Sequence, residues 1–341
     1  MAAYIARRLL LGLVVIWGLT VVTFAIARVA PGDPAARWVG PHATAEQIAQ
    51  ARVELGLDKP LYVQYARYLG QLLHGDLGVS IRTHQPVAAD IRTFLPASLE
   101  LTVAGMALAV ILGIPLGVAA AARSGRWLDH LTRLTSIGGV SMPTFWLAMI
   151  LQLVFFKQLH LLPLSGRIDT MTPLLHPVQP ITGSFLLDGL LEGNWPVFKD
   201  ALAHLILPAV TLAAYPLGLI VRMLRSSMIE TLGEDYVRAA RAAGFKERVV
   251  VYRYALKNAI APTLTVMALT FAYSLTGTFL IESVFDWPGL GNYAAEAVIT
   301  NDYPAIMGVT IVVAVMYVAL NLLVDVVQAL LDPRIRTGVA S

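Results

Sequence analysis

Long uncharged apolar stretches separated by short charged segments dominate the chain. Six of them are about 20 residues long, the length that an α-helix needs to cross the roughly 30 Å hydrocarbon core of a bilayer. They cover residues 9–27, 101–122, 134–156, 203–221, 259–281 and 305–324. The pattern predicts an all-α polytopic membrane protein with six transmembrane helices.

A seventh uncharged stretch, residues 170–187, has a different composition. It contains Pro173, Pro177 and Pro180, and each proline removes a backbone donor that lipid cannot replace. We expect a loop there that touches the membrane surface. The first apolar stretch follows two arginines as in a signal peptide, but its run exceeds the usual 7 to 15 residues. It is therefore interpreted as an uncleaved anchor.

Charge is distributed unevenly between the two sides that six spans define. Both termini and the connections 123–133 and 222–258 then share one side, which has an excess of Lys and Arg. The opposite side has an excess of Asp and Glu, although the whole chain carries a net charge of only +3. The positive-inside rule places both termini in the cytoplasm.

Composition and motif spacing exclude several classes of protein. The chain is 57% hydrophobic and 14% charged, whereas soluble domains have about 25% charged residues. Without cysteine it has no disulfide, thiolate metal site or thiol nucleophile. The seven histidines show no metal-ligand spacing, and no phosphate loop G-x-x-x-x-G-K-[ST] occurs. We expect neither an enzyme nor a cofactor or metal site in this chain.

The predicted spans divide the chain into four parts. The outer part is expected to contain an amphipathic helix at residues 60–73, where aromatic and leucine residues alternate with polar ones. Outer loop 157–202 and cytoplasmic loop 222–258 belong to the third part. The parts are the N-terminal segment with the first span (1–30), a large outer loop (31–97), a five-helix core (98–330) and a cytoplasmic tail (331–341).

Small residues and prolines within the spans predict packing features. Gly113 and Gly117 form a G-x-x-x-G pair that permits close contact between helices, and packing is favoured over a substrate role. Pro143, Pro208 and Pro216 predict kinks in the third and fourth spans.

The cytoplasmic loop contains start and stop signals of a short helix. Thr231 and Glu234 have capping-box spacing, and Gly244 supplies a left-handed stop, which predicts about 12 helical residues. Tyr236, Ala240 and Ala243 are expected to form a smooth stripe that another surface can approach. Two interpretations remain open: a protein-docking helix, or an interfacial helix lying on anionic lipid.

The same loop carries a family resemblance. Its Arg238-Ala239-Ala240-x3-Gly244, followed after nine residues by Tyr254-Ala-Leu-Lys257, resembles the EAA-x3-G-x9-I-x-L-P loop of ABC importer membrane subunits. Arg, Tyr and Lys replace the consensus Glu, Ile and Pro as they do in the peptide branch of the family. Further similar motifs are Ala30-Pro31-Gly32-Asp33-Pro34, Gly75-Asp76-Leu-Gly78, Met142-Pro143-Thr-Phe145-Trp146, Trp287-Pro288-Gly289-Leu-Gly291 and Asp302-Tyr303-Pro304.

The resemblance implies a permease subunit of a dipeptide/oligopeptide ABC importer with the type I importer permease fold. Such a subunit forms half of a translocation pathway in the bacterial inner membrane. Its expected partners are a second permease, two ATPase chains that bind ATP-Mg, and an extracytoplasmic substrate-binding protein. We expect no nucleic-acid partner.

The resemblance also implies roles for particular residues. The expected ATPase contact, a coupling helix, consists of Asp235, Tyr236, Arg238, Ala239, Ala240, Arg241 and Gly244. The expected docking residues for the binding protein are Asp33, Asp76, Trp287 and Asp302. The alternative for the outer motifs is structural, with a helix stop at residues 30–34 and a tight turn at 287–291.

Alternative functions remain open at this stage. Similar subunits serve nickel, glutathione and oligosaccharide importers, and the sequence does not distinguish these substrates from peptides. An ion-coupled secondary transporter would need repeats and buried ion ligands, and a membrane-embedded hydrolase would need a nucleophile and a base within the spans. No such features are evident in the sequence.

Overall fold

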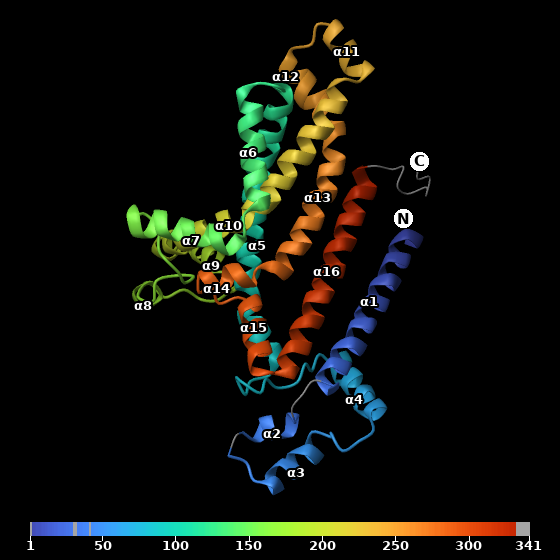
Figure 1. Cartoon of the computed structure of the whole chain (residues 1–341), viewed down its shortest axis with the longest axis vertical. Coiled ribbons are helices and arrows are strands. Elements are labelled where there is room, and N and C mark those ends of the chain that lie inside the picture. The colour runs from blue at the N-terminus through green and yellow to red at the C-terminus, as the bar shows by residue number, and fades with distance from the viewer. Residues whose placement is uncertain (1, 30–32, 41, 332–341) are drawn as a thin grey trace. The chain divides into compact units, whose positions relative to one another are not determined.

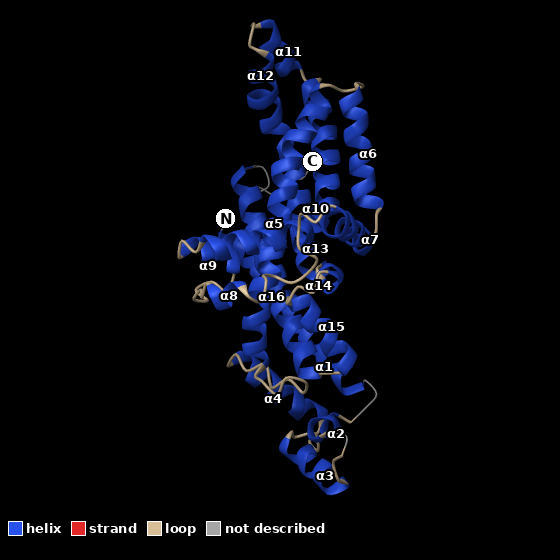
Figure 2. Cartoon of the chain, turned by 90° about the vertical axis from the view of Figure 1, so that its left-hand side faces the viewer, coloured by secondary structure: helices blue, strands red, loops and turns tan. Residues whose placement is uncertain are grey.

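A computed structural model describes residues 2–29, 33–40 and 42–331, and within these ranges the chain is helical, with no strand (Figures 1 and 2). The predicted tail and part of the 30–34 motif lie outside the described residues. The described residues form two compact units, a larger one built from residues 96–292 and 319–331, and a smaller one from the described parts of 2–95 and from 293–318.

Among the described residues, five continuous helical segments are long and apolar enough to span a membrane. They are Ile5–Arg28 in α1 (Ala2–Val29), α5 (Val87–Ala122), α10 (Trp195–Leu232), Glu247–Ser274, and Tyr303–Leu323 in α16 (Tyr303–Leu331). The fourth of these combines α12 (Glu247–Val249), η2 (Val250–Ala255) and most of α13 (Leu256–Gly277). The prediction of an all-α polytopic membrane protein is confirmed, whereas the cytoplasmic location of the termini stays a prediction.

The third predicted span, residues 134–156, is broken rather than straight. Helix α6 (Trp127–Ser141) and the pair formed by α7 (Thr144–Leu151) with η1 (Gln152–Gln158) meet at an angle of 110°. The break falls at Met142 and Pro143, where proline supplies no amide donor to the preceding turn. The kink predicted at Pro143 is confirmed in an extreme form, while α10 continues through Pro208 and Pro216.

Close contact between α5 and α10 forms the centre of the larger unit. A Cβ atom on Gly113 would lie 2.7 Å from Ile220 Cγ2, and one on Gly117 would lie 3.1 Å from Leu224 Cβ. A side chain at either glycine would therefore push the two helices apart. The packing role predicted for this glycine pair is confirmed, and α6 and α13 also pack along α10.

The outer loop of the larger unit contains the proline-rich stretch predicted to be irregular. Only two short helices occur there, α8 (Thr172–Leu175) and α9 (Phe185–Leu191). Arg167 anchors this loop through an ion pair of 2.6 Å with Glu100, and the Ser184 hydroxyl donates to the same carboxylate at 2.6 Å. The segment is thus ordered by polar contacts rather than by regular structure.

In the smaller unit, short helices follow the first span. Helix α4 (Leu61–Leu73) confirms the amphipathic helix predicted at residues 60–73, and Tyr65 and Tyr68 on it pack with Phe24 of α1 at ring distances of 5.2 and 5.9 Å. The remaining short helices are α2 (Pro34–Val39) and α3 (Ala45–Glu54) here, α14 (Phe279–Val284) in the larger unit and α15 (Leu290–Thr300), which enters both.

Candidate functional site

The connection between α10 and α13 contains the short helix α11 (Asp235–Ala242), which lies with α12 at one end of both long helices (Figure 1). Its start differs from the predicted one. Thr231 belongs to α10, where its hydroxyl donates to the Ser227 carbonyl at 2.7 Å, and Glu234 is the N-cap without a side-chain capping bond. The predicted capping box is therefore wrong, because Thr231 is used within the preceding helix. Helix α11 has 8 residues instead of about 12.

The end of α11 is the one that the sequence predicted. Gly244 has φ +82°, a conformation that is costly for residues with a Cβ atom. Its amide donates to Arg241 O at 3.0 Å, and the Phe245 amide donates to Ala240 O at 3.3 Å. These two bonds form a Schellman motif, which satisfies carbonyls that the helix end leaves free.

One face of α11 is used inside the chain. Val237 is fully buried and Ala240 is buried beside it, and both pack against Val250 of η2. The predicted stripe of Tyr236, Ala240 and Ala243 does not exist as one surface, because Ala240 points inward while the other two are exposed. The sequence reasoning missed Val237, although its spacing of three residues from Ala240 is the helical signal of a buried face.

The opposite face of α11 is polar and exposed. Arg238 pairs with Asp235 at 2.8 Å, and the Tyr236 hydroxyl accepts from Asn258 Nδ2 at 2.8 Å. Ala239 is exposed between them. Arg241 pairs with Glu247 at 2.8 Å, and the hydrogen bonds to that carboxylate raise the pKa of Arg241 above its usual range. Apart from the buried Ala240, the predicted contact side chains are available to a partner.

An ion cluster that the sequence reasoning missed joins α6 to α10. The Asp129 carboxylate is fully buried and accepts from Arg225 at 2.5 and 2.9 Å, from Arg133 at 2.9 Å and from the Gly125 amide at 2.9 Å. A buried carboxylate requires such compensation. The i, i+4 spacing of Asp129 and Arg133 was a signal in the sequence, but Arg225 lies too far along the chain to be paired from sequence alone.

Trp287 belongs to a buried turn at the end of the larger unit where α9 and α14 lie. Its side chain is 1% exposed, and its indole nitrogen donates to the Ala97 carbonyl at 2.9 Å. Glu282 is fully buried beside it and accepts from Ser98 Oγ at 2.5 Å and from the Asn292 amide at 2.8 Å. The Trp287 side chain is therefore unavailable for docking. Its burial agrees with the alternative interpretation, in which residues 287–291 form a tight turn with a structural role.

Asp302 in the smaller unit is also buried, with 1% exposure. Its carboxylate accepts from Ser80 Oγ at 2.5 Å, from the Arg82 amide at 3.1 Å and from the Ala305 amide at 3.2 Å. These bonds fix the loop at residues 80–82 on the start of α16. Because all of these contacts lie within the chain, Asp302 has a structural role instead of the docking role expected of it.

The other two candidate docking residues remain accessible. Asp33 is the N-cap of α2, accepts from the Ala35 amide at 3.0 Å and pairs with Arg52 at 2.6 Å. The hydrogen bond from Arg52 holds the pKa of Asp33 below its usual value. Asp76 is exposed and accepts from the Gly78 amide at 2.9 Å.

A groove of about 570 Å³ runs along α10 and α13 in the larger unit. The ring centroids of Tyr215 and Tyr273, which both line the groove, are 6.1 Å apart. Arg222 and Ser226 line it further along α10. No sequence pattern indicates which residues line this groove, because the lining depends on how residues about 40 to 60 positions apart on two helices align. Among the described residues, no group of three or more His, Asp or Glu side chains could hold a metal ion.

Comparison with known proteins gives consistent matches over almost the whole chain. The profile of the family described as "Binding-protein-dependent transport system inner membrane component" matches residues 113–337, and the profile of its N-terminal part matches residues 1–102. The chain is 47% identical to a probable D,D-dipeptide transport system permease protein of Escherichia coli K12, with 98% of each chain covered. It is 42% identical to the dipeptide transport system permease protein of the same organism and 41% identical to that of Alkalihalophilus pseudofirmus, covering 98% of this chain and 99% and 100% of theirs.

Proposed function

Because the chain belongs to the family of binding-protein-dependent transport system inner membrane components, we propose that it is the permease subunit of an ABC importer that takes up di- or oligopeptides. It forms half of the translocation pathway in a bacterial inner membrane. A second permease, two ATPase chains and an extracytoplasmic binding protein complete the machine. ATP-Mg is bound and hydrolysed by the ATPase chains.

Helix α11 is the proposed coupling element between the ATPase and the spans. The observation that carries this proposal is the division of the helix into two faces, with Val237 and Ala240 packed on the chain and Tyr236, Arg238 and Ala239 exposed. The buried face joins α11 to η2, which continues directly into α13. A push on the exposed face is therefore passed to a membrane-spanning helix.

The length of α10 supports the same role. Its 38 residues extend about 57 Å at 1.5 Å per residue, well beyond a hydrocarbon core of roughly 30 Å. The Asp129 cluster ties α6 to α10 near the end where α11 begins. Movement of α11 thus acts on a packed group of helices instead of on a loose loop.

The groove along α10 and α13 is the proposed contribution of this chain to the translocation path. It combines two tyrosines with Arg222 and Ser226 on the exposed sides of two spans. Their hydroxyl and guanidinium groups can form single hydrogen bonds with a peptide, which favours brief contacts over tight binding. The accessible Asp33 and Asp76 are retained as proposed docking residues for the binding protein.

The coupling proposal is tested in proteoliposomes that contain the permeases, the ATPase chains and a peptide-loaded binding protein. Reversing the charge with Arg238→Glu is expected to lower ATP-driven dipeptide uptake at least tenfold without changing the thermal stability of the complex. The matched control, Arg123→Glu, reverses an exposed arginine in the connection between α5 and α6 and should retain uptake. Unchanged uptake in Arg238→Glu contradicts the coupling role. Dipeptide uptake without ATP would instead identify a secondary transporter.

The proposed path is tested with introduced cysteines, which is straightforward because the chain contains none. Ser226→Cys, in the groove, should react with a water-soluble thiol reagent at a rate that changes when ATP is trapped on the complex. Thr211→Cys lies on the same helix but is fully buried and should remain unlabelled. A constant rate at position 226 in both states contradicts the proposed path.

A further inference from the structure

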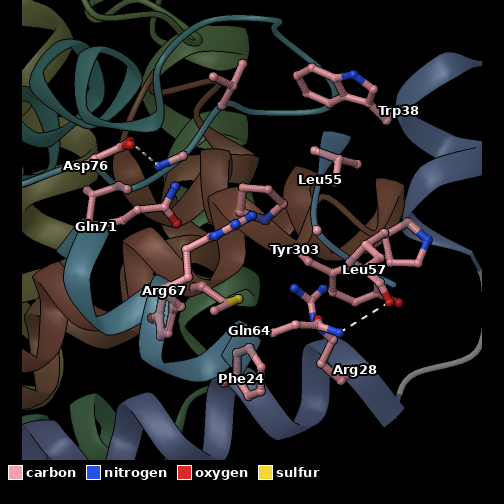
Figure 3. A pocket seen from close by; sticks show the side chains of 18 of the residues that line it. Phe24, Arg28, Trp38, Leu55, Leu57, Gln64, Arg67, Gln71, Asp76 and Tyr303 are labelled. Atoms are coloured by element: carbon pink, nitrogen blue, oxygen red, sulfur yellow. Dashed lines mark hydrogen bonds between the residues drawn. The ribbon is translucent and has the colours of Figure 1, made fainter. Parts of the chain in front are cut away.

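A pocket of about 410 Å³ lies within the smaller unit, between α1, α4 and the start of α16 (Figure 3). This volume falls within the range of about 300 to 1,000 Å³ that small-ligand sites occupy. Phe24 and Arg28 contribute from α1, Gln64 and Tyr68 from α4, and Tyr303 from α16. The coupling helix, the groove and the docking residue Asp33 are not part of it, although Asp76 lies at its edge.

Three buried polar atoms that line this pocket have no hydrogen-bond partner within the described part of the chain. They are Arg28 Nε, Gln64 Oε1 and Tyr303 Oη. Tyr303 is 6% exposed, so water from outside does not readily compensate its hydroxyl. An unpaired buried polar atom is costly, so three in one cavity indicate a missing ligand.

The surroundings of these atoms account for why they are unpaired. Both amide hydrogens of Gln64 are used, since Nε2 donates to the Lys59 carbonyl at 2.7 Å and to the Leu57 carbonyl at 3.3 Å. That contact fixes the amide orientation and leaves Oε1 as a free acceptor. The Tyr68 hydroxyl, by contrast, has the Thr23 hydroxyl as a partner, which donates to the Leu19 carbonyl at 2.8 Å and can still accept.

Donors and acceptors in the pocket define the chemistry of its ligand. Arg28 Nε requires an acceptor, and Figure 3 shows Arg67 directed into the same space. Gln64 Oε1 requires a donor, and the hydroxyls of Tyr68 and Tyr303 can donate or accept a hydrogen bond. A ligand that carries an anionic oxygen group and a nearby amine or hydroxyl satisfies all of them.

The position of the pocket along the spans selects among such ligands. Phe24 and Arg28 end the span Ile5–Arg28, and Tyr303 begins the span Tyr303–Leu323. The pocket therefore lies at the depth where a bilayer changes from hydrocarbon to head groups. On the face of helix α1 that also carries Phe24 and Arg28, Leu10, Leu13 and Trp17 are 63%, 62% and 59% exposed and offer an apolar surface for acyl chains.

We propose that this pocket binds the head group of an aminophospholipid, with the phosphate on Arg28 and Arg67, the ammonium on Gln64 Oε1, and the acyl chains along α1. Two soluble ligands share part of this chemistry. Free phosphate supplies the anionic group alone, and a zwitterionic dipeptide supplies a carboxylate and an amine. Neither of these soluble ligands uses the apolar surface beside the pocket.

Native mass spectrometry of the delipidated full-length chain with its bound partners tests the proposal, using phosphatidylethanolamine as the probe. The wild type should bind it about tenfold more tightly than diacylglycerol with the same acyl chains, as expected for one charged hydrogen bond. Arg28→Met should abolish most of this preference. Arg92→Met is the matched control, since Arg92 is an exposed arginine of the same unit outside the pocket, and it should bind like the wild type.

A second variant separates ligand binding from stability. Tyr303→Phe removes a hydroxyl that has no partner within the described residues, so thermal stability without lipid should be unchanged. Affinity for phosphatidylethanolamine should nevertheless fall severalfold. Equal binding of diacylglycerol, or unchanged affinity in both variants, overturns the proposal. Displacement of the lipid by free phosphate or by a dipeptide assigns the pocket to that soluble ligand and also overturns it. None of these measurements depends on transport.

Discussion

The α11 connection and the turn at residues 282–291 lie at opposite ends of the larger unit and use their conspicuous residues in opposite ways. In α11 the charged residues are outside and a valine and an alanine hold the helix in place. In the turn, Trp287 and Glu282 are inside and fully bonded within the chain. Both regions carry a motif that resembles the family pattern. Such a motif shows that particular residues are required, but it does not reveal whether a partner or the fold requires them.

The glycines of the turn clarify the difference further. A Cβ atom on Gly291 would lie 2.9 Å from Glu282 Oε2 and 3.0 Å from the backbone of Phe279. Glycine is required there because the chain packs against itself. In α11, by contrast, Gly244 has open space around it and is required only for its positive φ.

The largest expected effect is the loss of Trp287. Trp287→Ala removes a buried indole together with its hydrogen bond to the Ala97 carbonyl, which should destabilise the chain by about 3 to 5 kcal/mol. Thermal unfolding of the detergent-solubilised complex measures this. Trp195→Ala is the control, since that indole is 56% exposed and its removal should have little effect. Equal shifts in both variants would contradict the burial of the turn.

Disruption of the Asp129 cluster is expected to have the next largest effect. Asp129→Asn leaves Arg225 without its buried anionic partner, for a loss of about 2 kcal/mol, because Arg225 itself remains partly exposed. Hydrogen exchange should show faster opening of α6 and the end of α10. Asp286→Asn serves as the control: the residue is exposed, and asparagine tolerates its positive φ. Identical exchange in α6 of the two variants would contradict the stabilising role of the Asp129 cluster.

A smaller effect is expected at Gly244. Gly244→Ala forces a side chain into the left-handed region at a cost of about 1 kcal/mol, confined to the end of α11. Limited proteolysis at residues 243–246 should become faster. Gly138→Ala, in a helix with open space around the glycine, should be neutral or slightly stabilising. A global loss of stability in Gly244→Ala would show that α11 is part of the core.

The smallest effect on stability is expected for the exposed ion pair of α11. Asp235→Asn with Arg238→Gln removes the pair, and thermal unfolding should be unchanged because both side chains are largely in solvent. ATP-driven uptake should fall, since the exposed face is the proposed ATPase contact. A fall in the unfolding temperature with normal uptake would mean that these residues stabilise the fold, as Trp287 and Glu282 do in the turn. The contrast between the two regions would then be wrong.

Local signals in the sequence predicted much of this architecture. Apolar runs located the spans, alternation of aromatic and polar residues located α4, and Gly244 marked the end of α11. In each case the physical cause acts within a few residues, so a short window of sequence contains it. The start of α11 was missed because Thr231 can serve either as a cap or within the last turn of α10.

Long-range contacts account for the features that the sequence did not predict. The burial of Trp287 depends on Ala97, and that of Asp302 depends on Ser80, residues separated from them by about half the chain or more. The unpaired atoms of the pocket come from three helices that meet only after folding. No local pattern distinguishes such residues from exposed ones of the same type.

The Asp129 cluster has a consequence for the order of events during synthesis. Asp129 and Arg225 are 96 residues apart. At roughly 5 to 20 residues per second, the ribosome adds Arg225 about 5 to 20 seconds after Asp129. During that interval Arg133, one turn away on the same helix, already neutralises the carboxylate. Arg133 can thus serve as the counter-ion of Asp129 in α6 until α10 has been synthesised and supplies Arg225.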